Sequence, residues 1–145
     1  MEDEDKRQQT LIVLWAAMLM SIVMLFVVSL VAAPVIIQPP PFANLVSFAG
    51  AALGTFLVGF SFVIKKRLLK RSVDQQDVLL VQKALIIGCA MCEACAMIGV
   101  VEAFVIGGID RYLLFFLAAA GVAFHFPRSL NLQSASYKSG INQGF

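Results

Sequence analysis

Residues 83–107 decide the fold, and they read KALIIGCAMCEACAMIGVVEAFVIG. This stretch is long enough to cross a bilayer as a helix, because about 20 apolar residues at 1.5 Å each span the hydrocarbon core. It carries Glu93 near its middle, about 15 Å along a helix from Lys83. A carboxylate at that depth costs several kcal/mol unless it is protonated or paired, so Glu93 is the first candidate for a functional residue.

The composition of the whole chain points to a membrane protein. Of its 145 residues, 60% are hydrophobic and 14% are charged, whereas a soluble domain is about 45–50% apolar. We therefore predict one helical membrane domain over residues 1–130 and a polar tail over 131–145. The net charge of +2 is too small to favour nucleic acid as a partner. The sequence contains no nucleophile triad, phosphate loop or helical His-Glu pair, so we expect no enzyme activity, cofactor or metal.

Apolar runs predict the membrane spans. They cover residues 11–33, 42–64, 81–107 and 110–128. Prolines end the first run, because proline lacks an amide hydrogen and blocks continuation of a helix. The segment from Ser129 onward is rich in Ser, Asn, Gln and Gly, and by composition it is disordered unless a partner orders it. The predicted fold is an all-α integral membrane bundle of four transmembrane helices.

The basic residues set the orientation of these helices. With four spans, Arg111 lies on one side of the membrane and the remaining basic residues lie on the other. Those directly after the second span are Lys65, Lys66, Arg67, Lys70 and Arg71. Because basic loops stay in the cytoplasm, both termini are predicted to be cytoplasmic, with the bacterial inner membrane as the location. The same cluster is compatible with binding of anionic lipid.

A glycine pair in the second span suggests a neighbour for Glu93. Gly50 and Gly54 form a G-x-x-x-G pair, which lets another helix approach closely. In an antiparallel hairpin of the second and third spans, this pair lies at about the depth of Glu93. Glu93 could then take and release a proton, or bind a cation together with Thr55 and nearby carbonyls. Alternatively, a protonated Glu93 holds a neighbouring helix by a hydrogen bond, or it pairs with a charge on a partner subunit.

Two further ionisable residues are secondary candidates. Glu102 lies nine residues beyond Glu93, which places it on the opposite face of the helix. We expect it near the outer interface, where water or Arg111 could satisfy it. His125, near the inner end of the fourth span, could relay protons, or it could lie at headgroup level or hydrogen-bond a neighbour.

The three cysteines of the chain resemble a metal motif only superficially. Cys89, Cys92 and Cys95 follow one another at intervals of three, which spreads them around a helix, and no fourth ligand accompanies them. We expect them to act as small hydrophobic residues that allow close packing.

Residues 45–107 resemble the helical hairpin of the proteolipid subunit c of rotary ATP synthases. In that family a glycine-rich helix and a polar loop precede a helix with a mid-membrane acid, here in the stretch AMCEACAMIGVVEAF. The resemblance implies that Glu93 is the ion-carrying carboxylate and that Gly50 and Gly54 form the close-packing notch. The family's Arg-Gln-Pro loop is absent, and the acid lies in the third of four predicted spans.

Two functions follow from these observations. The first is a small polytopic membrane subunit in which Glu93 binds or relays protons or cations. The alternative is a non-catalytic accessory subunit of a larger membrane complex. In either case the expected partners are the lipid bilayer and either copies of the same chain or other membrane subunits.

Overall fold

The computed structural model describes residues 2–34, 36, 40–109 and 111–136. Its elements are α1 (Glu2–Ala32), α2 (Ala43–Gln75), α3 (Val78–Val105), α4 (Arg111–Phe124) and α5 (Ser129–Ser136). All secondary structure in the described residues is therefore helical, and the predicted all-α fold class is confirmed.

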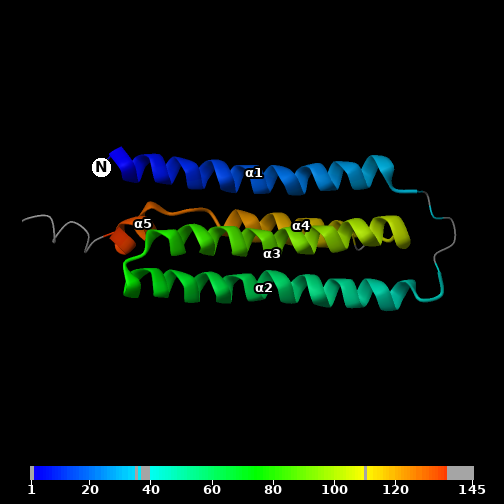
Figure 1. Ribbon diagram of the computed structural model, residues 1–145. Helices are drawn as coiled ribbons and strands as arrows, with labels where there is room; N and C mark the ends of the chain where they lie inside the picture. Colours follow the sequence, from blue (N-terminus) through cyan, green and yellow to red (C-terminus); the bar gives the residue numbers. More distant parts are fainter. Residues whose placement is uncertain (1, 35, 37–39, 110, 137–145) are drawn as a thin grey trace, which may run out of the picture.

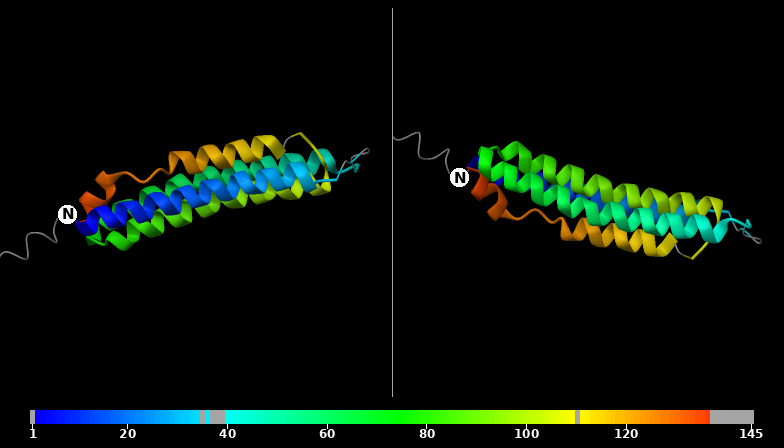
Figure 2. Two further views of the ribbon diagram at one scale, coloured as in Figure 1. Left: turned by 90° about the horizontal axis from the view of Figure 1, so that it is seen from above. Right: turned by 90° about the horizontal axis from the view of Figure 1, so that it is seen from below.

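The first four helices lie side by side along one axis and alternate in direction (Figures 1 and 2). The start of α1, the turn between α2 and α3, and α5 share one end of the bundle (Figure 1). The opposite end carries the connections from α1 to α2 and from α3 to α4. Helix α3 packs against α1, α2 and α4, so it lies at the centre of the bundle.

Helices α1, α2 and α3 are each long and apolar enough to cross a membrane. Helix α4 has 14 residues, or about 21 Å, which is less than the roughly 30 Å of a hydrocarbon core. It begins and ends inside the predicted span of residues 110–128. The four residues after it are not helical, and α5 begins at Ser129.

Helix α5 corrects the expectation that the chain is disordered from Ser129 onward. It packs against α1, α2 and α3, and Ala135 is completely buried there. The side-chain amide of Gln76 donates a hydrogen bond of 3.4 Å to the carbonyl oxygen of Ser134. These tertiary contacts order a segment whose composition alone does not favour a helix. The rest of the predicted tail, residues 137–145, lies outside the described part of the chain.

The turn between α2 and α3 shows why one helix stops and the next begins. Gln76 has a left-handed backbone with φ of 53°, and its N–H bonds to the carbonyl of Ser72, which is a common helix end. Asp77 then caps α3, because its carboxylate accepts a hydrogen bond of 2.9 Å from the N–H of Leu79. Helices α2 and α3 consequently form a tight antiparallel hairpin.

Candidate functional site

Glu93 lies half-buried at an edge of α3, between the fully buried Cys92 and the exposed Ala94. It was predicted to occupy the notch at Gly50 and Gly54, but it lies elsewhere. The side chains nearest to Gly50 and Gly54 come instead from other positions, namely Ile98, Glu102, Cys95 and Leu114. There are two physical reasons, the register of the α2–α3 hairpin and the rotation of α3. The Ser61 hydroxyl lies beside Cys92, so Glu93 is level with Ser61, about 10 Å along α2 from Gly54. The α2-facing stripe of α3 passes through Cys95 and Glu102, and Glu93 is about 160–180° away from that stripe.

Glu102 is the acid that packs against the notch. A β-carbon added at Gly50 would collide with a carboxylate oxygen of Glu102, so the absence of a side chain at Gly50 makes room for this group. Glu102 is only 2% exposed. The expectation of a partly solvated residue at the interface is therefore wrong. Glu102 and Glu93 do lie on opposite faces of α3, but α2 covers the face with Glu102. Thr55 is exposed on α2 and is no part of this arrangement.

Helices α2, α3 and α4 meet along a line of small residues, which we call the three-helix seam: Gly54 and Ser61 of α2, Cys92 and Cys95 of α3, and Gly121 of α4. The Ser61 hydroxyl lies 3.8 Å from the sulfur of Cys92, and the Cys95 thiol donates to the carbonyl of Leu114 at 3.6 Å. A β-carbon added at Gly121 would lie 2.7 Å from the Cys92 sulfur. The cysteines thus act as small packing residues, and no cluster of potential metal ligands occurs among the described residues.

His125 directly follows α4 and is completely buried. Its Nδ1 lies 2.7 Å from the carbonyl oxygen of Gly121. Because a carbonyl only accepts hydrogen bonds, Nδ1 carries a proton and donates it. The imidazole rests against Gly88, where a β-carbon would clash with it, and its centroid is 4.6 Å from that of the Phe62 ring. His125 is therefore part of the protein interior.

The basic cluster after the second predicted span divides into buried and exposed members. Lys65 is half-buried, whereas Lys66, Arg67, Lys70 and Arg71 are exposed along the end of α2. A cavity of about 10 Å³ lies beside Lys65, and His125 and Arg128 also line it. Sequence reasoning did not bring these three residues together. The spacing of Ser61 and Lys65 by one helical turn was the available signal that Lys65 points inward.

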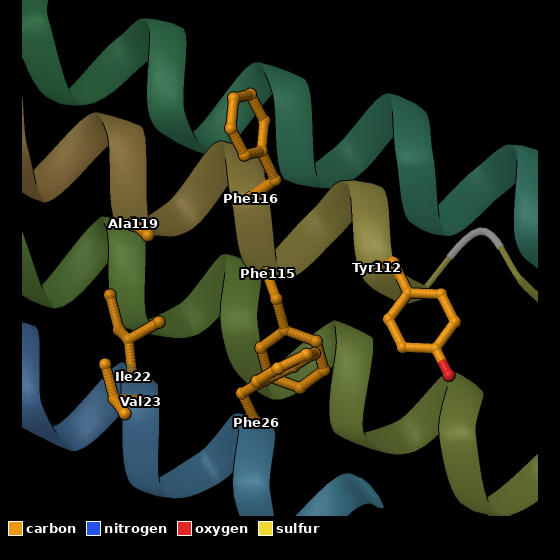
Figure 3. Close-up of a pocket in the computed structure, with 7 residues that line it drawn as sticks. All are labelled: Ile22, Val23, Phe26, Tyr112, Phe115, Phe116 and Ala119. Carbon is orange, nitrogen blue, oxygen red and sulfur yellow. The ribbon is translucent and has the colours of Figure 1, made fainter.

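A groove of about 260 Å³ runs between α1 and α4 on the outside of the bundle. Figure 3 shows the rings of Phe26 and Phe115 against each other at its base, with their centroids 5.3 Å apart. The Tyr112 hydroxyl points away from the groove toward the end of the bundle (Figure 3). It accepts a hydrogen bond of 3.1 Å from Arg111. The groove is thus apolar along its length, as expected for a surface that faces lipid tails or another helix.

Comparison with known protein families, curated proteins and solved structures gave no match.

Proposed function

We propose that the protein is integral to a membrane, with α1 to α4 all crossing it and both termini on the cytoplasmic side. Three long apolar helices support this topology, as does the basic end of α2 beside the start of α1 (Figure 1). Helix α4 is short, but residues 125–128 continue toward the same end. At about 3.3 Å each they extend its reach by up to about 13 Å, which brings the total to the thickness of the hydrocarbon core. We place the protein in a bacterial inner membrane.

Within the membrane, we propose that Glu93 forms a proton- or cation-binding site completed by a neighbouring subunit. The observation that carries this proposal is a half-buried carboxyl at the edge of an apolar helix. The adjacent outward-facing residues Ala90 and Ala94 are small and leave room for a partner helix. A carboxyl at this edge needs such a partner in hydrocarbon, where an unpaired charge is costly. The resemblance to subunit c favours the same role.

The second candidate is an accessory subunit without ion handling. The three-helix seam favours it, because sulfur and methyl groups fill the space at Gly54 and Gly121. At these two glycines the described side chains leave no gap through which water or ions could pass. In this case the partner helix would hold Glu93 by a hydrogen bond, and the role of the chain would be to contribute helices and lipid contacts to a complex.

Labelling with a hydrophobic carbodiimide separates the two candidates. In native membranes, we expect the reagent to modify wild-type protein at Glu93 and the Glu93→Gln variant not at all, because the reagent attacks protonated carboxyls within the bilayer. Glu102→Gln is the matched control, since it removes a more deeply buried acid from the same helix. It should leave the labelling unchanged.

The effect of cations on this labelling decides the function. Na⁺ or high pH should reduce the labelling of Glu93 by the carbodiimide if Glu93 is an ion- or proton-binding site. If wild-type protein remains unlabelled and Glu93→Gln assembles normally with its partners, the ion-binding proposal is wrong and the accessory role is retained.

A further inference from the structure

The small cavity at the basic end of the bundle brings two cations together. Lys65 reaches it from α2, and Arg128 reaches it from the segment just before α5. Among the described residues no carboxylate lines it; apart from His125, the other lining residues are apolar, among them Leu85 and Pro127. Neither cation forms an ion pair within the described part of the chain. Two neighbouring positive charges without a counter-charge attract an anion.

His125, which also lines this cavity, carries a buried polar atom. Because Nδ1 donates its proton to Gly121, the Nε2 of the neutral imidazole is a hydrogen-bond acceptor. This Nε2 is buried and accepts no hydrogen bond from the described atoms. Leaving such an acceptor unsatisfied is unfavourable. The cavity measures about 10 Å³, and a volume of about 10–15 Å³ accommodates one water molecule.

We propose that Lys65 and Arg128 bind a phosphate group at the mouth of this cavity, and that one water molecule inside it connects the phosphate to His125. The water donates one hydrogen to Nε2 and the other to a phosphate oxygen. The Arg128 guanidinium offers paired N–H donors to the phosphate, and the Lys65 ammonium adds a point charge. This geometry satisfies the buried acceptor and both cations at once.

The phosphate has two potential sources, a lipid headgroup or a free phosphate ion in the cytoplasm. In the proposed topology the cavity lies at the level of the cytoplasmic headgroups, so a lipid can reach it. This part of the inference depends on the membrane topology but not on the ion-binding role of Glu93. If the experiment on the phosphate site fails, the ion-binding proposal for Glu93 is unaffected, and the reverse also holds.

Thermal unfolding of the full-length protein in micelles tests the site. Phosphatidylglycerol should raise the unfolding midpoint of the wild type by several degrees, because a ligand that binds the folded state stabilises it. Lys65→Gln and Arg128→Gln should lose most of this rise. Lys66→Gln is the matched control, because it removes the same charge from the exposed neighbouring position, and it should keep the rise.

Parallel titrations identify the source of the phosphate. A rise with inorganic phosphate alone assigns the site to a free anion, whereas a rise with phosphatidylglycerol only assigns it to a lipid headgroup. A rise of equal size in all four proteins would mean general charge attraction and would overturn the proposal, as would no rise in any of them.

The imidazole gives an independent readout on unmutated protein. The chain has a single histidine, so a ¹⁵N-histidine spectrum contains one pair of ring signals. Addition of the phosphate ligand should shift the Nε2 signal while the Nδ1 signal remains that of a protonated nitrogen. An unchanged Nε2 signal at saturating ligand would contradict the role of His125.

Discussion

Replacing Gly54 by leucine is expected to destabilise the bundle strongly, because this position has no free space. A β-carbon there would lie 2.6 Å from a methyl carbon of Leu114 and 2.9 Å from the sulfur of Cys95. Inserting side-chain atoms into a filled core costs about 1–3 kcal/mol, and a leucine adds three carbons beyond the first. We expect a loss near the upper end of that range in the free energy of unfolding, measured by denaturing-detergent titration in micelles.

Gly59→Leu is the control for this prediction. Gly59 belongs to the same helix, but apart from the adjacent backbone of that helix no described atom lies within 4 Å of a β-carbon placed there. The same substitution should therefore change the free energy of unfolding little. Equal losses in both variants would indicate an effect of leucine on α2 itself. A neutral Gly54→Leu would show that the three-helix seam does not hold the bundle together.

The helices could be predicted from the sequence because apolar runs and helix-breaking residues mark them directly. The second membrane span was predicted at residues 42–64, and Leu68 and Leu69 indicated that the helix continues beyond the lipid. Helix α2 does continue, to Gln75. The length of an apolar run shows how much of a helix lies in the hydrocarbon core, not where the helix ends. The basic residues that follow the run are good helix formers and extend the helix beyond the lipid. The end of α2 is set by the left-handed Gln76 and the cap at Asp77.

The residues that meet the notch could not be predicted, because an apolar run fixes neither the register of the α2–α3 hairpin nor the rotation of α3. A G-x-x-x-G pair indicates that another helix approaches closely, and Gly50 and Gly54 are indeed buried. It does not indicate which face of that helix approaches. Helix α3 has small or apolar residues all round, so no polar stripe identifies an outer face. The turn at Gln76 and Asp77 brings Glu102 level with Gly50 and leaves Glu93 level with Ser61, so register and rotation together select Glu102.

Trp15→Ala is expected to have the second large effect, because Trp15 connects α1 to the end of α4. Its indole N–H donates a hydrogen bond of 2.7 Å to the carbonyl oxygen of Val122. Its ring meets Phe126 edge-on, with centroids 5.1 Å apart. Loss of both contacts, and the cavity left behind, should lower the free energy of unfolding by roughly 2–4 kcal/mol. The denaturing-detergent titration in micelles measures this change in the free energy of unfolding.

Trp15→Phe separates the two contributions. Phenylalanine retains an aromatic ring beside Phe126 but has no N–H, so it leaves the Val122 carbonyl without this donor. We expect a loss of about 1 kcal/mol, clearly smaller than for alanine. If alanine and phenylalanine cost the same, the hydrogen bond provides all of the stabilisation and the ring contact none. If neither substitution matters, the other contacts of α1, with α3, with α5 and with α4 at Phe115, are enough to hold it.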